Sequence, residues 1–94
     1  MIKHIVCFKL NEGESAKVAR NVLLGMKENV PMLRGIEVGI DELHSPRSYD
    51  VILTVLLDDM SALEAYQDDP YHVSVVKKHM HAVAKSSISL DYTI

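Results

Sequence analysis

The chain has 94 residues, of which 48% are hydrophobic and 24% are charged, and this size and balance predict one soluble globular domain spanning residues 1–94. The formal net charge of −3 at pH 7 and the lack of a basic stripe argue against a nucleic-acid partner. No apolar run approaches the roughly 20 residues that a membrane-spanning helix needs, so we expect no membrane partner.

The N-terminus and the cysteine content predict a cytoplasmic protein. Met1 to His4 is strand-like and lacks the basic region and long apolar run of a signal peptide. Cys7 is the only cysteine, so it cannot form an internal disulfide, and one thiol does not make a metal site. Because Cys7 lies in the middle of a predicted strand, we expect it to be buried and to act as a small apolar group.

The first half of the chain predicts a strand, a helix and a second strand. Ile2 to Leu10 is rich in β-branched and aromatic residues, as strands are. Apolar side chains at helical spacing predict a helix from about Ser15 to Val30, which Pro31 ends. Ile36 to Leu43 starts with the apolar and polar alternation of a half-buried strand.

The second half repeats this order with a broken helix. Tyr49 to Leu57 is almost continuously apolar, which predicts a strand covered on both faces. One helix is expected over Ala62 to Asp68 and another from Pro70 to about Lys85. Ser86 to Ile94 alternates apolar and polar residues and predicts the last strand.

The helix break carries the first candidate site. Asp69 before Pro70 is typical of an N-cap followed by proline at the first helical position. Tyr66 then lies on the last turn of one helix and His72 on the first turn of the next, and such a break can direct both side chains to one spot. The alternative is a capped helix start with an incidental tyrosine and histidine, which are commonly half-buried.

Two further polar residues have plain structural explanations as well. His4 lies among apolar neighbours, where a hydrogen-bonded, partly buried histidine is expected. Asp91 lies on the terminal strand, where a carboxylate is usually solvated. His72 and His79 are about 10 Å apart along a helix axis, so one metal ion cannot bind both. We therefore predict no metal and no cofactor.

The element order is βαββαβ with the second helix split. Two right-handed units of this kind give an α+β, ferredoxin-like fold, a four-stranded antiparallel sheet with helices on one face. Both faces of Ile2 to Leu10 and of Tyr49 to Leu57 are largely apolar. A bare apolar sheet face is a partner surface, and the simplest solution is a two-fold homodimer that packs sheet on sheet.

The sequence also resembles a known family, the Dabb proteins, which are stress-responsive dimeric α/β-barrel domains. The resemblance covers nearly the whole chain and rests on the order and spacing of several segments: Ile2 to Val6, Val30-Pro31, Ile36 to Gly39, Tyr66 to Val73 and Asp91 to Thr93. It implies a ferredoxin-like fold and a homodimer whose two sheets form a barrel. Most members of the family have no established reaction.

The resemblance also implies a set of site residues. In olivetolic acid cyclase-type members, the catalytic tyrosine and histidine match Tyr66 and His72, and the supporting histidine and aspartate match His4 and Asp91. A neutral imidazole can remove a proton next to a carbonyl group. A phenol can hydrogen-bond the enolate oxygen that forms, and a carboxylate can fix the histidine tautomer.

The chain departs from that cyclase pattern at three positions. Val51 and Leu23 stand where the cyclase has a pocket histidine and a pocket tyrosine, and Asp69 replaces the family's frequent histidine before proline. These changes put a polyketide substrate in doubt.

The resemblance also raises the question of a metal site. Some plant members bind magnesium through main-chain carbonyls whose positions match Lys27, Val30 and Leu33. Carbonyls at a helix C-terminus can hold a cation. A lysine among them adds repulsion, so we expect no metal there.

The sequence leaves open whether the protein is an enzyme. The first expectation is a homodimeric Dabb-domain protein that binds a small molecule in a pocket between helices and sheet. The alternative is a cofactor-independent acid–base cyclase or lyase that acts on a small carbonyl compound. A more distant alternative is a cofactor-free monooxygenase of the dimeric barrel group. A closed cavity lined by Tyr66, His72 and His4 would favour an enzyme.

Overall fold

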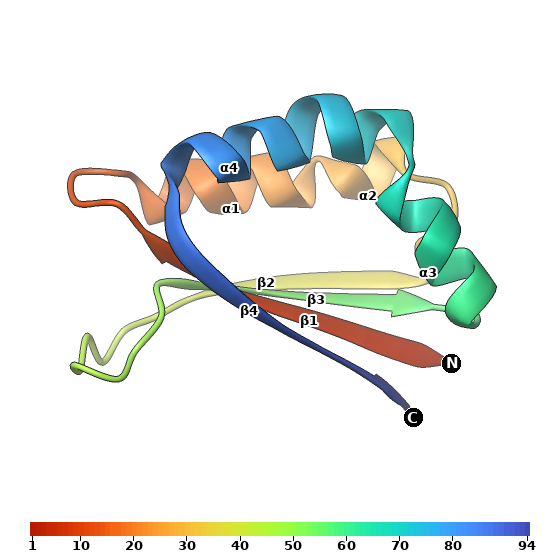
Figure 1. Cartoon of the computed structure of the whole chain (residues 1–94), viewed down its shortest axis with the longest axis horizontal. Coiled ribbons are helices and arrows are strands. Elements are labelled where there is room, and N and C mark those ends of the chain that lie inside the picture. Colours follow the sequence, from red (N-terminus) through yellow and green to blue (C-terminus); the bar gives the residue numbers. More distant parts are fainter.

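The computed structural model describes residues 1–94 as two layers, with a four-stranded antiparallel sheet below and all helices on one of its faces (Figure 1). The elements in chain order are β1 Ile2–Leu10, α1 Ala16–Leu24, α2 Met26–Asn29, β2 Gly35–Ile40, β3 Val51–Leu57, α3 Met60–Gln67, the π-helical segment η1 His72–Lys77, α4 Lys78–Val83 and β4 Ala84–Thr93. The predicted ferredoxin-like order is confirmed. No helix has the length and apolar content needed to cross a membrane.

The sheet order is β2-β3-β1-β4, so the two inner strands carry most of the core. In β3 the side chains alternate, with Val51, Leu53, Val55 and Leu57 buried under the helices. Ile52 points to the open face and is 40% exposed. The expectation that this strand is covered on both faces is therefore wrong for the single chain. Both crossover connections run over the same face of the sheet, which leaves the other face bare.

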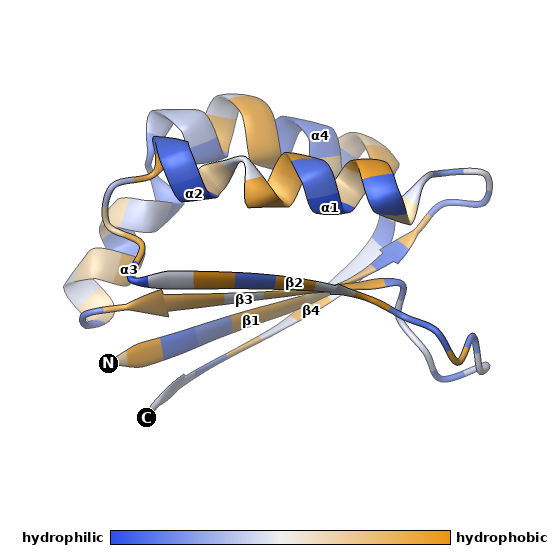
Figure 2. Cartoon of the chain, turned by 180° about the vertical axis from the view of Figure 1, so that it is seen from behind, coloured by the Kyte–Doolittle hydropathy of each residue, from blue (hydrophilic) through white to orange (hydrophobic).

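The core lies between the two layers. Figure 2 shows hydrophobic colour along β3 and on parts of the helices above it. Thirteen buried residues make one cluster, contributed by the inner strands and by every helical segment. The departures at Leu23 and Val51 fall inside this cluster, where both side chains serve packing.

The first predicted helix is broken at Gly25. The Asn29 side-chain amide donates to the Gly25 carbonyl oxygen at 2.8 Å, and the short helix α2 begins at Met26. The hydroxyl of Tyr71 packs against Gly25, so close that a Cβ there would lie 2.6 Å from it. Apolar periodicity continues across residue 25, which is why the sequence predicts one helix where the structure has two.

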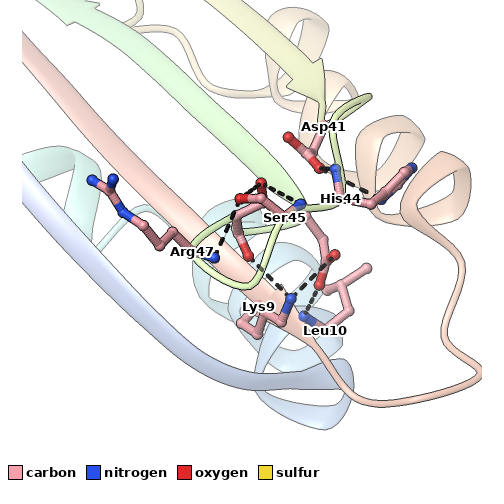
Figure 3. Close-up of polar contacts among 8 residues, drawn as sticks. Lys9, Leu10, Asp41, His44, Ser45 and Arg47 are labelled. Carbon is pink, nitrogen blue, oxygen red and sulfur yellow. Dashed lines mark hydrogen bonds and ion pairs between the residues drawn. The ribbon is translucent and has the colours of Figure 1, made fainter.

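The loop between β2 and β3 is longer than predicted because both strands are shorter at that end. The Asp41 amide donates to the Asp50 carbonyl at 2.9 Å, and the Asp41 carboxylate accepts the His44 amide at 2.7 Å. Lys9 donates to the Ser48 carbonyl at 3.0 Å. Figure 3 shows Lys9 of β1 directed at the loop and Asp41 beside His44 at its start, and the Lys9 contact fastens the loop to β1.

The predicted cap at the second helix break is confirmed. The Asp69 carboxylate accepts the amides of Tyr71 and His72, both at 3.0 Å, and Pro70 follows as the first helical residue. No local sequence pattern predicts the π-helical turn that starts at His72. The helix ends at Val83 rather than near Lys85, since β4 begins at Ala84.

We expect Asp69→Ala to lower the free energy of unfolding by about 1–2 kcal/mol, because it leaves two helix amides without their acceptor. Urea denaturation measures the change. Asp68→Ala is the matched control, because the neighbouring carboxylate is exposed. Equal losses in the two variants would show that the cap does not stabilise the break.

Candidate functional site

Three polar rings pack together between the helices and β1. Tyr66 comes from α3, His72 from η1 and His4 from β1. The rings of Tyr66 and His72 are stacked, with centroids 4.1 Å apart and an interplanar angle of 23°. The ring of His4 meets Tyr66 edge-on at 5.5 Å and 65°. The break at Asp69 thus brings the tyrosine and histidine on its two sides into contact.

The buried imidazole of His72 is fixed in one tautomer. Its Nδ1 lies 2.9 Å from the main-chain oxygen of Tyr66, and a carbonyl only accepts, so Nδ1 carries the proton. In the neutral ring Nε2 then keeps its lone pair. Burial lowers the pKa of His72 and outweighs the hydrogen bond to the Tyr66 carbonyl, which raises it, while the nearby positive charge of Lys77 lowers it further. The ring is therefore neutral at pH 7 and chemically able to accept a proton.

The second imidazole is held by a carboxylate. The register of β1 and β4 pairs His4 with Asp91, so their side chains lie on the same face of the sheet. His4 Nδ1 binds the Asp91 carboxylate. The His4 ring is buried, whereas the Asp91 side chain is 32% exposed. Asp91 is thus a partner of a buried histidine and more than a solvated surface charge.

The phenol of Tyr66 is fully buried, and its hydroxyl meets an unexpected partner. The hydroxyl donates to Met26 Sδ at 3.7 Å. Burial, and then the charges of Asp69 and Asp91, raise the pKa of Tyr66, so the phenol keeps its proton. Tyr66 and Met26 both belong to the main core cluster. No local sequence pattern predicts the contact between them.

The four predicted site residues form a packed cluster without an open pocket. None of the five hollows in the surface is lined by Tyr66, His72, His4 or Asp91. The two largest hollows, each of about 460 Å³, lie elsewhere. One is at the loops around Lys9 and Lys85, and the other runs between α1 and α4 beside Val22 and His79. In the single chain, the four residues line no hollow, and Tyr66, His72 and His4 are buried while the Asp91 side chain is partly exposed.

The residues after α2 do not fit a divalent cation. The Val30 carbonyl accepts the Leu33 amide at 3.4 Å. The hollow beside it, which Leu33 also lines, contains the cationic residues Lys27 and Arg34. Positive charge of this kind repels a metal ion. No group of three or more histidine, cysteine, aspartate or glutamate residues could hold a metal.

The lowered pKa of His72 predicts a pH-dependent stability. Below about pH 6.5, the ordinary imidazole value, the unfolded chain binds a proton that folded His72 resists. The folding free energy that this residue contributes is therefore full above that pH and is lost as the pH falls through the lower folded pKa. His72→Asn should flatten the fall in unfolding free energy measured by urea denaturation from pH 7 to pH 5. The exposed His81 provides the control His81→Asn, which should keep the wild-type slope.

Comparison with known proteins gives a family and a set of similar folds. The family model described as the stress responsive A/B barrel domain, Dabb, matches residues 2–94. Comparison with curated proteins finds no match.

Three solved structures illustrate the similarity of fold. A dimeric protein of unknown function with a ferredoxin-like fold from Bacteroides fragilis is 25% identical, with a TM-score of 0.79 over 99% of this chain and 95% of its own. The hydroxynitrile lyase of Passiflora edulis is 17% identical, with a TM-score of 0.78 over 99% and 92%. A structure described as an antibiotic biosynthesis monooxygenase is 13% identical, with a TM-score of 0.77 over 100% and 98%. Because the family model spans nearly the whole chain, the protein belongs to the Dabb family of stress-responsive A/B barrel domains.

Proposed function

We propose that this Dabb protein is a homodimer that binds a small molecule at Tyr66, His72, His4 and Asp91. The observation that carries the proposal is the stack of a phenol and an imidazole, with a second imidazole against the phenol's edge. Burying polar rings costs free energy unless each finds a partner, and apolar side chains would fill the same space without that cost. Three polar rings in the core of so small a domain therefore favour a binding role.

A second candidate function is cofactor-independent acid–base chemistry on a small carbonyl compound. His72 Nε2 would take a proton from the carbon next to the carbonyl, and the C–H electron pair would form an enolate. The Tyr66 hydroxyl would hydrogen-bond the enolate oxygen. The neutral state of His72 at pH 7 supports its role as a base. Similar folds occur in a hydroxynitrile lyase and in a structure described as an antibiotic biosynthesis monooxygenase, and in both cases the likeness is of fold alone.

Proton exchange of acetone in D₂O tests this chemistry without knowledge of the natural substrate. If His72 is the base, the protein should speed the loss of the acetone proton signal in NMR spectra above the rate in buffer. His72→Ala and Tyr66→Phe should each lower the catalysed rate by roughly 10²-fold, and both should keep the wild-type circular dichroism spectrum.

His81→Ala is the control for this experiment, because it removes an exposed imidazole from the same helical segment. Its exchange rate should equal that of the wild type. An unchanged rate in both site variants would exclude the acid–base function. Acetone binding without any exchange would leave the first candidate, a binding protein.

The homodimer is proposed to form through the open face of the sheet. This face carries exposed apolar side chains from β3 and β4, among them Ile52, Ile88, Leu90 and Tyr92. Leu90 is 63% exposed in the single chain. A contiguous patch of exposed apolar side chains usually marks a protein–protein interface. The similar protein from Bacteroides fragilis is described as dimeric, which supports a dimer here.

Sedimentation at micromolar concentration should give twice the 10.5 kDa mass of the chain. Leu90→Asp places a charge in the proposed interface and should shift the mass to that of a monomer. Leu43→Asp is the control, because Leu43 is also an exposed leucine but lies in the loop after β2.

Cys7 gives an independent check on the interface. Its thiol lies on the open face and is half-buried in the single chain, and burial already raises its pKa. A thiol reagent should label the wild-type dimer slowly and the Leu90→Asp variant faster. A monomeric wild type with rapid labelling would contradict the interface.

A further inference from the structure

The hydroxyl of Tyr66 has an unusually weak partner for a fully buried donor. Its one contact is Met26 Sδ at 3.7 Å, and both side chains are completely covered. A thioether sulfur is a weak acceptor, whereas buried hydroxyl groups normally find an oxygen or nitrogen. An oxygen acceptor in the place of the Met26 sulfur would therefore make a stronger hydrogen bond with the Tyr66 hydroxyl.

Met26 is suited to leave that position. Its side chain is unbranched and has several rotatable bonds, so it adapts to different surroundings at low cost. It is also the first residue of α2, a four-residue turn separated from α1 at Gly25. Rotation of this one side chain would free space beside the Tyr66 hydroxyl and leave the sheet and the long helices in place.

We propose that Met26 is the movable plug of a binding site at the Tyr66 hydroxyl, and that the site takes a small neutral ketone or aldehyde. This inference rests on the proposed function and adds to it a residue that decides which ligands fit. It also accounts for the absence of a hollow at the four site residues, since Met26 fills the space that the ligand's carbonyl group would take.

The surroundings of Tyr66 select a neutral carbonyl compound over an acid. The carbonyl oxygen would accept the phenol hydrogen bond in place of the sulfur. A carboxylate would lose its hydration in this buried place, and the negative charges of Asp69 and Asp91 already act on Tyr66. A neutral ligand meets neither cost.

Methyl NMR of the wild-type protein tests the plug directly. In protein labelled with methyl-¹³C methionine, acetone should move the Met26 signal toward the shift of an exposed methionine such as Met60. The signal of Met80, which is buried in the same core cluster, should stay in place. A Met26 signal that does not move while acetone binds elsewhere would overturn the inference.

Two substitutions at the plug should change acetone affinity in opposite directions. Met26→Ala should bind acetone at least about 10-fold more tightly than the wild type, because no side chain has to be displaced. Met26→Leu fills the space with a stiffer side chain and should bind more weakly. Met80→Ala removes the other buried methionine of the core cluster, which makes no hydrogen bond to the Tyr66 hydroxyl, and it should leave the affinity unchanged. If Met26→Ala proves unfolded, Met26→Leu and the methyl signals still decide.

The Tyr66 hydrogen bond is tested in the same background. Adding Tyr66→Phe to Met26→Ala should lower acetone affinity several-fold, because the donor is lost. Tight binding by Met26→Ala that survives Tyr66→Phe would contradict the assigned site. If only the acid–base function is wrong, the Met26→Ala variant will still bind acetone through Tyr66 but will not exchange the acetone protons.

Discussion

The interaction on which the site depends is the cap that Asp69 places on the second half of the helical layer. One carboxylate oxygen binds two main-chain amides, and this fixes the direction in which the chain leaves the break. His72 is one of the two residues held in this way. Its ring therefore stacks on the ring of Tyr66, which belongs to the preceding helix α3. The hydrogen bond from His72 to the Tyr66 carbonyl then closes the break from the other side. The hydrogen bonds that form the helix break therefore also set the geometry of the candidate site.

The sheet supplies the other half of the site. β1 is an inner strand, paired with β3 on one side and β4 on the other. His4 is therefore held rigidly under the helices, and the β1–β4 register sets Asp91 beside it. A shift of one residue in that register would turn Asp91 to the opposite face. The polar cluster thus ties together the first strand, the last strand and the helix break, which lie far apart in the sequence.

The hydrophobic core and the candidate site share a residue in this small domain. Tyr66 is at once a core residue and the candidate ligand-binding group, and its hydroxyl is satisfied only by sulfur. Domains of this size have little stability to spare, so a poorly partnered polar group in the core has a real cost. Met26 limits that cost in the free protein, because its thioether covers the phenol and excludes water.

The sequence by itself determined the order of the elements and the cap at Asp69, and it showed that Tyr66 and His72 could meet across the break without deciding that they do. These features follow from local rules: apolar periodicity, proline chemistry and capping act over a few residues. His4 and Asp91 were assigned from a resemblance to a family, and periodicity alone gave them only structural roles. Their contact is made by strand register, which joins residues 87 positions apart in the sequence.

Only the tertiary structure decided the rest. The close approach of the Tyr71 hydroxyl to Gly25 joins two segments that lie far apart in the sequence, and no local pattern could show it. Which side chains of β3 face the helices depends on how the crossovers pack on the sheet. The contact between Tyr66 and Met26 depends on how α2 and α3 pack across 40 positions of sequence. Each of these features arises from contacts between distant segments, and a reading of neighbouring residues contains no information about such contacts.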